Sequence, residues 1–383
     1  VAVGGDVALP TVGASSPAPS ALLPTWARLR EGSGPPTAAI EPDLACALAE
    51  ARSDQMLRVI VVLRQQADPA GIVRRESGAL APEMARARLV TEMRTLAERS
   101  QAPLLAALDQ AQRAGQVASY TPFWIFNGVA VAARPEAIHA LAARSDVAVV
   151  RLDRYQQWLP GPSFVETDLD PAISSAVEWG VARIRADEVW SSLHISGTGV
   201  VVGGMDTGVD WLHPALRTNY RGYNPHGIHS HVGNWFDAVT GAIYPIDDHG
   251  HGTHTMGSAV GQEGIGVAPG ARWIAVKAFN KDGGAYESWI HAGFQWLMAP
   301  GGDPARAPDV VNCSWGNDNG AVTTFLPDLQ AIRAAGIVPV FSNGNNGPQA
   351  GTVGSPASLP GAFGVGASDD QDRVAYFSSR GPS

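Results

Sequence analysis

The segment 247–261 constrains this chain more than any other stretch of its sequence. It reads Asp-Asp-His-Gly-His-Gly-Thr-His-Thr-Met-Gly-Ser-Ala-Val-Gly, so histidines and glycines precede a run of small residues that suits a closely packed helix. Gly250 and Gly252 leave room for the backbone to approach another segment. A histidine at the positive N-terminus of a helix can exchange protons near neutral pH. The segment therefore predicts a site of proton transfer, with His251 at the start of the helix.

The composition limits the classes of protein that remain. The chain has 383 residues, of which 45% are apolar, so two domains with sizeable cores are expected. Its formal net charge of −9 argues against nucleic acid and anionic membranes as partners, because both require a basic surface. No apolar run reaches the roughly 18–20 residues that a membrane-spanning helix needs. Cys46 and Cys313 fall in different predicted domains, so we expect two buried thiols and no disulfide.

The first 180 residues predict a leader, a small domain and a linker. Residues 1–40 are rich in Pro, Ala, Ser and Gly, and residues 1–53 are expected to form a disordered leader. Residues 54–153 predict a β-α-β-β-α-β order, which is the ferredoxin-like arrangement of an α+β domain. Residues 154–180 are interrupted by prolines and are expected to form a linker that a protease can cut. The elements expected within the small domain are strands at 57–63, 119–126, 128–133 and 147–152 and helices at 82–114 and 135–144.

From residue 181 to residue 383, apolar strands alternate with helices. This alternation predicts an α/β domain with a doubly wound, mostly parallel sheet. Such sheets bind and react at the carboxyl ends of their strands. The expected strands are 199–205, 271–277, 309–314, 336–341 and 362–367, and the clearest helices are 286–297 and 326–335.

Two further motifs fall at the ends of predicted strands. Asp206 follows the first strand within Met-Asp-Thr-Gly, and a carboxylate there can accept the Nδ1 proton of a histidine and stabilise its cation. Asn345 follows the fourth strand within Asn-Gly-Asn-Asn-Gly, and its amide can donate to a developing oxyanion. Read alone, Asp-Thr-Gly is also typical of a solvated turn, and the asparagine run of a loop with left-handed residues. Together with His251, they predict one catalytic site.

The order Asp206, His251, Asn345 resembles the subtilisin-like serine proteases (peptidase family S8), over about residues 176–383. The resemblance implies that Asp206 and His251 belong to an Asp-His-Ser triad and that Asn345 is the oxyanion donor. It also implies that a polypeptide substrate adds as an extended strand between two edges of the domain. The residues implied in substrate binding are Ser314, Trp315 and Gly316, where the P1 pocket would favour apolar side chains, and Gly283, Gly284 and Ala285 on the opposite edge.

The small domain resembles the inhibitory propeptide (inhibitor I9 type) of the same family, most of all its extended form in bacillopeptidase F-like enzymes. The resemblance implies a secreted precursor whose own propeptide docks on the catalytic domain and fills the substrate cleft. A propeptide of this kind would also assist folding, because a parallel sheet is rich in non-local contacts and folds slowly. The opening at Val1 has neither the basic nor the apolar region of a signal peptide, so we expect that the signal is not part of this chain.

The family nucleophile lies in Gly-Thr-Ser-x-Ala-x-Pro, and no such string occurs in these 383 residues. Ser383 lacks the helix that should follow the nucleophile. We therefore expect a partial sequence of an active endopeptidase, incomplete at the C-terminus of its catalytic domain and inactive as it stands. The alternative is a pseudoprotease, a subtilase-like protein that binds peptides without cutting them.

No cofactor is expected for the chemistry, and no metal ligand is assigned. An alternative is a zinc site formed by His249, His251 and His254 with Asp247, Asp248 and one of His226, His229 or His231. The spacing of the three first-named histidines is not one of the strong zinc patterns. Segment 261–268 is shorter than the loop that carries the strong calcium site in relatives. A structural calcium elsewhere stays open and cannot be placed from the sequence.

Overall fold

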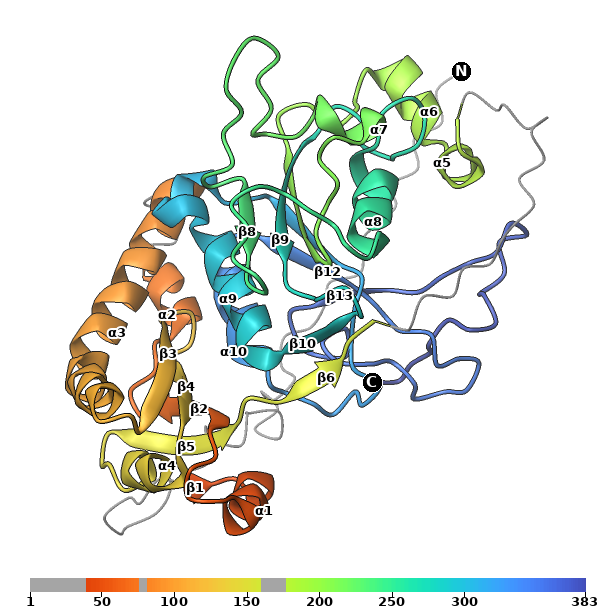
Figure 1. Cartoon of the computed structure of the whole chain (residues 1–383). Helices are drawn as coiled ribbons and strands as arrows, with labels where there is room; N and C mark the ends of the chain where they lie inside the picture. The colour runs from red at the N-terminus through yellow and green to blue at the C-terminus, as the bar shows by residue number, and fades with distance from the viewer. Residues whose placement is uncertain (1–38, 76–80, 160–176) are drawn as a thin grey trace.

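The computed structural model describes residues 39–75, 81–159 and 177–383, and these form two packed units (Figure 1). Residues 39–159 make an α+β unit, and residues 177–383 make a larger α/β unit. The helices α9 (Glu287–Met298) and α10 (Leu326–Ala334) lie between the sheet of the α/β unit and the sheet of the α+β unit. One apolar cluster, which includes Phe123 and Phe294, runs through this contact.

The α+β unit has a sheet in the order β1-β5-β2-β4-β3. Its four antiparallel strands have the order of a ferredoxin-like sheet, and β1 adds to β5 in parallel. The strands are β1 (Ala39–Ile40), β2 (Leu57–Leu63), β3 (Val117–Phe123), β4 (Gly128–Ala133) and β5 (Val147–Leu152). The helices are α1 (Pro42–Glu50), α2 (Pro69–Arg74), α3 (Pro82–Arg113) and α4 (Pro135–Ala142), of which α3 and α4 lie where the sequence predicts them.

The prediction of a disordered leader through residue 53 is wrong at its end, because regular structure begins at Ala39. Helix α1 buries Leu44 and Leu48 in the same cluster as β2 and α4. Helix α1 was not predicted because its apolar pattern is short and directly follows the Pro-rich stretch. Residues 1–38 lie outside the described residues. Cys46, on α1, is exposed rather than buried, whereas Cys313 is buried, and both thiols are free.

The prediction of a linker at 154–180 is also wrong for its first and last residues. Tyr155–Gln157 form strand β6, which pairs with β10 (Gly284–Tyr286) of the α/β unit. Trp158 and Leu159, which follow β6, are only 3% and 1% exposed. Residues 160–176 lie outside the described part of the chain, and α5 (Trp179–Arg183) begins soon after them.

The α/β unit contains a six-stranded parallel sheet in the order β13-β12-β11-β7-β9-β8. Helix α8 (His251–Val260) packs on one face through Met256 and Val260, while α9 and α10 cover the other. This arrangement confirms the predicted α/β class with a doubly wound parallel sheet. The strands are β7 (Val201–Asp206), β8 (Trp235–Asp237), β9 (Arg272–Lys277), β11 (Val310–Cys313), β12 (Val338–Ser342) and β13 (Phe363–Val365). The shorter helices are α6 (Ala186–Glu188), α7 (Pro214–Arg217) and three single turns at 189–193, 300–302 and 304–306.

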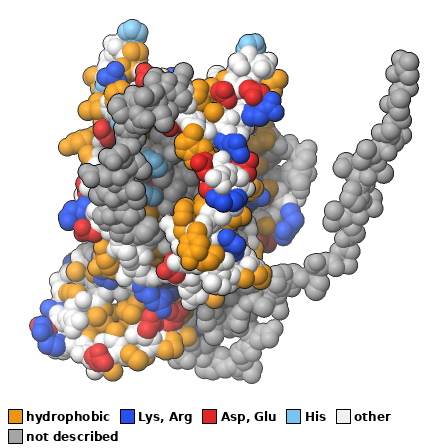
Figure 2. Space-filling view, turned by 90° about the vertical axis from the view of Figure 1, so that its right-hand side faces the viewer, with side chains coloured by type: hydrophobic (Ala, Val, Ile, Leu, Met, Phe, Trp, Pro, Cys, Tyr) orange, Lys and Arg blue, Asp and Glu red, His pale blue; other side chains and the backbone are white. Residues whose placement is uncertain are grey.

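Strand β7 is central in the sheet, with β11 on one side and β9 on the other. Chain order reverses between β7 and β11, and open α/β sheets bind ligands at such a switch point. Figure 2 shows one face of the molecule, on which acidic and basic side chains of the described residues are interspersed. Within the described residues, every helix is too short or too polar to cross a membrane.

Candidate active site

Asp206 and His251 meet at the carboxyl end of β7. Asp206 is the last residue of that strand and is 3% exposed, and His251 is the first residue of α8. His251 Nδ1 donates to Asp206 Oδ1 over 2.7 Å, and Thr207 N donates to the same oxygen over 2.7 Å. Within the described part of the chain, no hydrogen bond reaches the second ring nitrogen of His251, and the side chain keeps 27% exposure. The imidazole is therefore oriented from one side and open on the other.

Two glycines explain why α8 can begin so close to β7. Gly250 precedes the helix with a φ of 95°, in the left-handed region that favours glycine. At Gly252, a Cβ atom would lie 2.1 Å from the carbonyl oxygen of Gly208 and 3.0 Å from Cβ of Asp206. The close approach of backbone that the sequence suggested is thus a contact between the start of α8 and the turn after β7.

The site favours a positive charge on His251. Burial disfavours the cation, but the hydrogen bond and charge of Asp206, together with the charge of Asp247, outweigh it and raise the pKa of His251 above its ordinary value. The charged form of the Asp247 carboxyl is favoured in the same way. Burial opposes its charge, yet hydrogen bonds from Thr253, Gly250 and Thr207 lower its pKa. Asp247 is therefore a fixed negative charge beside the histidine.

Asp247 and Thr207 are positioning residues that the sequence analysis missed. Asp247 accepts from Thr253 Oγ1 at 2.6 Å and from Thr207 Oγ1 at 2.9 Å. Thr207 Oγ1 in turn accepts from the amide of Gly252 at 2.9 Å. These bonds join the turn after β7 to the first turn of α8. The sequence carried a signal for both residues, because Asp247 is the first residue of the histidine segment and Thr207 directly follows Asp206.

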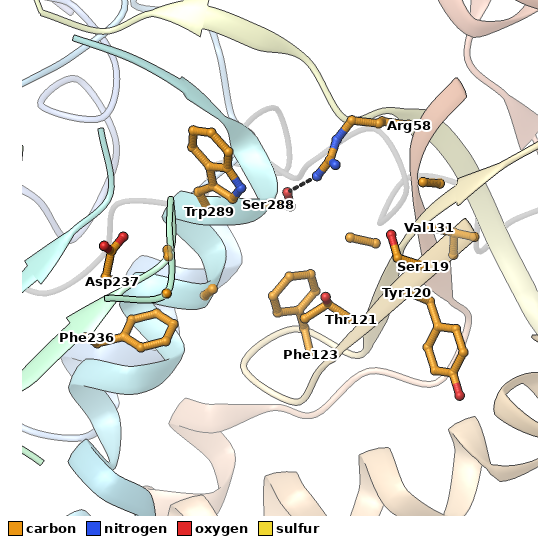
Figure 3. Close-up of a pocket in the computed structure, with 15 residues that line it drawn as sticks. Arg58, Ser119, Tyr120, Thr121, Phe123, Val131, Phe236, Asp237, Ser288 and Trp289 are labelled. Atoms are coloured by element: carbon orange, nitrogen blue, oxygen red, sulfur yellow. Dashed lines mark hydrogen bonds between the residues drawn. The ribbon is translucent and has the colours of Figure 1, made fainter. Parts of the chain in front are cut away.

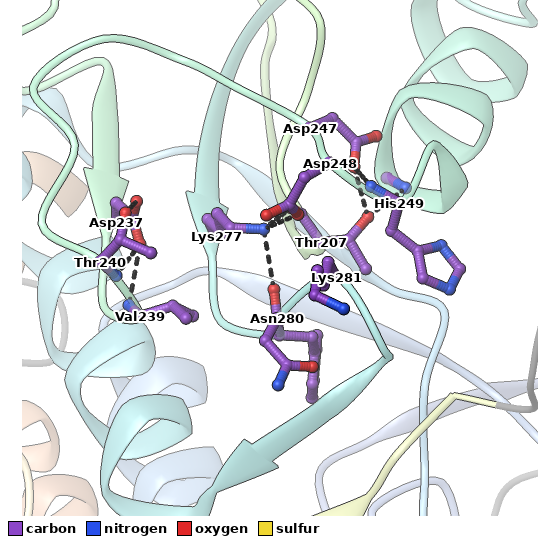
Figure 4. A network of polar contacts seen from close by, with 12 residues as sticks. Thr207, Asp237, Val239, Thr240, Asp247, Asp248, His249, Lys277, Asn280 and Lys281 are labelled. Carbon is purple, nitrogen blue, oxygen red and sulfur yellow. Dashed lines mark hydrogen bonds and ion pairs between the residues drawn. The ribbon is translucent and has the colours of Figure 1, made fainter.

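Lys277 is a third residue that the sequence analysis missed (Figure 4). It ends β9 and is completely buried. Its ammonium group donates to Thr207 O at 2.6 Å, to Phe279 O at 3.0 Å and to Asp248 Oδ1 at 2.5 Å. One buried cation thus joins the ends of β7 and β9 to the segment that carries His251.

Asn345 lies in the loop after β12, and its side chain is exposed. Gly344 precedes it with a φ of 100°, and the amide of Ser379 donates to Gly344 O over 3.0 Å. The amide of Asn346 donates to Ser379 Oγ over 3.0 Å, so the loop is held on both sides of Asn345. Because β12, β11 and β7 are parallel, Asp206, which ends β7, and Asn345, which follows β12, lie at the same edge of the sheet. The oxyanion role of Asn345 stays a prediction.

The predicted binding edge at Gly283, Gly284 and Ala285 is paired with another part of the chain. β10 carries Gly284 and Ala285, and it pairs in antiparallel register with β6. The amides of Trp158 and Leu159 both donate to Gly283 O, at 3.1 and 3.3 Å. We call residues 155–159 the tail of the α+β unit. The tail lies as an extended strand on this edge.

The opposite predicted edge contacts the same tail. The amide of Gly316 donates to Trp158 O over 3.3 Å. The Trp158 ring packs edge-on against Trp315, with ring centroids 5.8 Å apart, and against Phe325. Trp315 is 1% exposed, so its indole lies in the core and contacts the tail instead of lining an open pocket. Ser314 is half-buried and accepts from Asn312 Nδ2 at 3.0 Å.

The histidines of the zinc alternative have separate partners. His251 Nδ1 contacts Asp206, whereas His249 Nδ1 accepts from the amide of His251 at 3.4 Å, and His254 is exposed. Among the residues that the structure describes, no group of three or more His, Cys, Asp or Glu side chains is placed to hold a metal ion. The structure therefore offers no support for the zinc reading.

Comparison with known proteins gives a consistent answer. The model of the subtilase family matches residues 197–383. Bacillopeptidase F of Bacillus subtilis (strain 168) is 39% identical over 319 residues, which cover 78% of this chain and 22% of that protein. This match is longer than the α/β unit, so it includes part of the α+β unit. Serine protease AprX of the same organism is 31% identical over 65% of this chain and 54% of its own length.

Subtilisin DY of Bacillus licheniformis is 32% identical over 214 residues, which cover 54% of this chain and 70% of that protein. The shorter relatives are thus matched over most of their length, whereas the chain spans about a fifth of bacillopeptidase F. The similarity includes the parallel sheet at whose edge Asp206 and His251 meet. These matches and this fold show that the chain belongs to the subtilase family.

Proposed function

We propose that the protein is a serine-type endopeptidase that hydrolyses peptide bonds in polypeptides. The observation that carries the proposal is the 2.7 Å contact between His251 Nδ1 and Asp206 Oδ1, with Nε2 of His251 open. In this reaction Asp206 holds the tautomer of His251 and stabilises its cation. His251 takes the proton of a serine hydroxyl and gives it to the leaving amine. The exposed amide of Asn345 donates to the oxyanion.

The reaction needs a serine nucleophile, and none is assigned to a residue of this chain. The subtilase nucleophile motif does not occur in the 383 residues, so these residues do not distinguish the enzyme from a second candidate. That candidate is a subtilase-like protein that binds peptides in the same cleft without cutting them. The two candidates share the fold and the binding edges, and they differ in covalent chemistry.

We also propose that the enzyme is made as a self-inhibited precursor and that residues 39–159 are its propeptide. The tail supports this proposal, because it bonds to Gly283 and Gly316, the two edges expected to bind substrate as an extended strand. A chain segment in that place excludes a substrate from the same main-chain bonds. Secretion and the absence of any required cofactor stay predictions of the family resemblance.

The first test is the coding sequence beyond codon 383, followed by an assay of the whole encoded protein. An in-frame Gly-Thr-Ser-x-Ala-x-Pro string supports the enzyme. The whole protein should then cleave a quenched fluorescent polypeptide and react with a fluorophosphonate probe for serine hydrolases. His251→Ala should reduce cleavage on the order of 10⁴-fold or more. His254→Ala, an exposed position on the same helix, is the matched control and should change it only a few-fold.

A whole protein that binds peptides but neither cleaves them nor reacts with the probe would establish the pseudoprotease instead. Cleavage that survives His251→Ala unchanged would refute the assigned mechanism. Secretion is tested separately, by locating the protein in culture supernatant or cells.

A further inference from the structure

One polar atom beside the candidate active site has no partner among the described residues. Nε2 of His249 is shielded from solvent, and no described donor or acceptor bonds to it. The ring of His249 lies next to the ring of His251, with centroids 6.2 Å apart and planes at 82°. A shielded polar group without a partner is uncommon in a folded chain and requires a physical explanation.

The other nitrogen of the ring fixes what this atom can do. The amide of His251 donates to Nδ1 of His249 over 3.4 Å, so Nδ1 is an acceptor. A neutral imidazole that accepts at Nδ1 carries its proton on Nε2. His249 therefore presents one N–H donor that no described residue uses. Leaving this donor unbonded costs the folded chain the desolvation free energy of the group.

The backbone of His249 is anchored by the network that positions His251, while its ring points away from that network. The amide of His249 donates to Asp247 Oδ1 over 3.1 Å. Figure 4 shows the ring turned away from Asp247, Thr207 and Lys277. The side chain is half-buried and the χ2 torsion of histidine is broad, so a small rotation turns Nε2 toward the open side. The donor is therefore available to a group that enters the cleft.

Three other described side chains have a shielded polar atom without a partner, and they lie elsewhere. They are Gln116 and Arg134 in the α+β unit and Asn219, which is 4% exposed. His249 is the one beside the candidate active site. Its unused donor therefore has a ready explanation in the binding of a substrate.

The charged groups that line the cavity between the two units have partners. Figure 3 shows this cavity of about 280 Å³, which Arg58, Ser288 and Asp237 help to line. Arg58 donates to Asp153 at 3.0 Å and reaches Ser288 Oγ at 3.4 Å, and Asp237 accepts from two amides of its own turn. Satisfied charges require no ligand, so the donor of His249 is the stronger sign of a binding site.

Charge decides which acceptors fit beside His249. Asp247 is a fixed negative charge, and Asp248 keeps 42% of its side chain exposed. The buried ammonium group of Lys277 pairs with Asp248. With Asp206, three carboxylates of the described chain thus surround one lysine. A further carboxylate would be repelled here, whereas an uncharged carbonyl oxygen would not.

The distance to His251 decides which part of a substrate is within reach. In the proposed reaction, Nε2 of His251 acts at the scissile bond. The rings of His249 and His251 are 6.2 Å apart, and one residue of an extended chain spans about 3.3–3.6 Å. The acceptor therefore belongs to a residue within about two positions of the scissile bond.

We propose that His249 is a substrate-binding residue, whose Nε2–H donates to an uncharged carbonyl oxygen of a polypeptide near the scissile bond. The oxygen belongs either to the side-chain amide of Asn or Gln or to the main chain, and the test separates the two. In the first case, His249 selects Asn or Gln at one substrate position. The proposal rests on the proposed function only in that a polypeptide occupies the cleft, as the enzyme and the peptide-binding candidate both require.

The test measures equilibrium binding by fluorescence anisotropy and needs no cleavage. The protein is the whole encoded chain with Trp158→Ala, which weakens the hold of the tail on the two edges. Where the protein has a serine nucleophile, that serine is replaced by alanine. The probes are labelled peptides that begin with Tyr-Gln-Gln-Trp-Leu, the sequence of residues 155–159, and continue with alanines. Each alanine is replaced in turn by Asn, Gln, Asp or Leu.

Two variants and one control isolate the donor. His249→Phe keeps a ring and removes the donor, whereas His249→Gln keeps a donor. His249→Phe should weaken binding about three- to tenfold, the usual effect of one lost hydrogen bond, and His249→Gln should restore part of it. A side-chain acceptor confines the loss to peptides with Asn or Gln at one position, and a main-chain acceptor gives the same loss for every peptide. His254→Phe, at an exposed position on α8, should bind like the wild type.

Thermal unfolding of the same variants without peptide separates binding from a structural role. An unbonded donor does not stabilise the fold, so His249→Phe should be at least as stable as the wild type. A clear loss of stability would mean that Nε2 has a partner within the chain, and this would overturn the proposal. Unchanged peptide binding in His249→Phe would overturn it as well, and so would tighter binding of Asp peptides than of Asn peptides.

The outcome for His249 is separate from the outcome for the enzyme. A whole protein that binds peptides through His249 but never cuts them would keep this site and lose the proposed enzyme. An active enzyme that binds and cleaves equally well with His249→Phe would show the reverse. A protein that binds none of the probes would refute the site together with the peptide-binding cleft.

Discussion

At the residue scale, Asp206 controls the proton affinity of His251. The pKa of His251 is raised in the folded chain, because Asp206 and Asp247 together outweigh the effect of burial. The folded state therefore holds the proton more tightly than the unfolded chain does. The stabilisation from this pair is complete below about 6.5, the ordinary histidine value, and is lost as the pH rises through the raised pKa. A general base must be neutral, so the proposed activity should rise over the same interval.

Asp206→Asn should lower the pKa of His251, since it removes the charge and the acceptor that favour the cation. Burial, which acts in the opposite direction, would remain. The measurement is an NMR titration of the His251 ring, which needs no nucleophile and can be made on this chain. A pKa of His251 that rises or stays fixed would contradict this electrostatic account. Asp282→Asn, at an exposed position, is the control.

Gly252→Ala should destabilise the chain by about 1–3 kcal/mol, the usual cost of overpacking. The added Cβ would meet the backbone oxygen of Gly208 at 2.1 Å, and neither backbone can rotate away. Gly257→Ala on the same helix is the matched control, because its nearest neighbour would be Ile265 at 4.0 Å. That control should gain up to about 1 kcal/mol in helix propensity. Thermal or denaturant unfolding of the two variants tests the difference, and equal stabilities would contradict it.

At the scale of elements, Lys277 joins the ends of β7 and β9 to the segment before α8. Lys277→Met should cost at least about 2 kcal/mol of stability, because Thr207 O and Phe279 O lose a buried donor. Lys281→Met is the control. Its ammonium group is exposed and pairs with exposed Asp282, so about 0–1 kcal/mol is expected. Denaturant unfolding measures both, and a Lys277→Met chain as stable as the control would show that the buried cation is dispensable.

The sequence predicted the elements whose pattern is local. The strand at 57–63, the helix at 82–114 and the strands that precede Asn345 and end at Asp206 were placed correctly to within a few residues. A local apolar run or a local run of helix-forming residues marks each of them. The sequence did not predict β6, since three residues before a proline-rich stretch become a strand only by pairing with β10, over 120 residues away. The role of Lys277 was not predicted either, because in the sequence it is only a polar residue at the end of a strand. Its partners lie on other segments, and a sequence pattern does not reveal them.

At the scale of the whole molecule, each unit supplies hydrogen-bond partners to backbone groups of the other. Arg86 of α3 donates to Ala335 O at the end of α10 over 2.7 Å, and Gln295 of α9 accepts from the amide of Trp124 at 2.6 Å. These bonds satisfy helix-end and loop groups that would otherwise need water. The α+β unit therefore stabilises α9 and α10, the two helices that cover one face of the parallel sheet.

That sheet depends on contacts between distant parts of the chain. Val202 of β7 lies opposite Val310 of β11, so the central pair forms only after a long loop has closed. A unit that binds α9 and α10, which flank β11 in sequence, would hold the parts of the sheet together while it forms. We therefore expect a chain without residues 1–159 to refold from denaturant at least about tenfold more slowly, or to stop at a compact state that exposes apolar surface.

Tryptophan fluorescence and binding of a hydrophobic dye follow this refolding. A chain that lacks only residues 1–38 keeps every described contact between the units and is the control, with an unchanged rate. Recovery of the native sheet at the same rate without residues 1–159 would mean that the α/β unit folds unaided. The contacts of Arg86 and Gln295 would then matter for holding the two units together and not for forming the sheet.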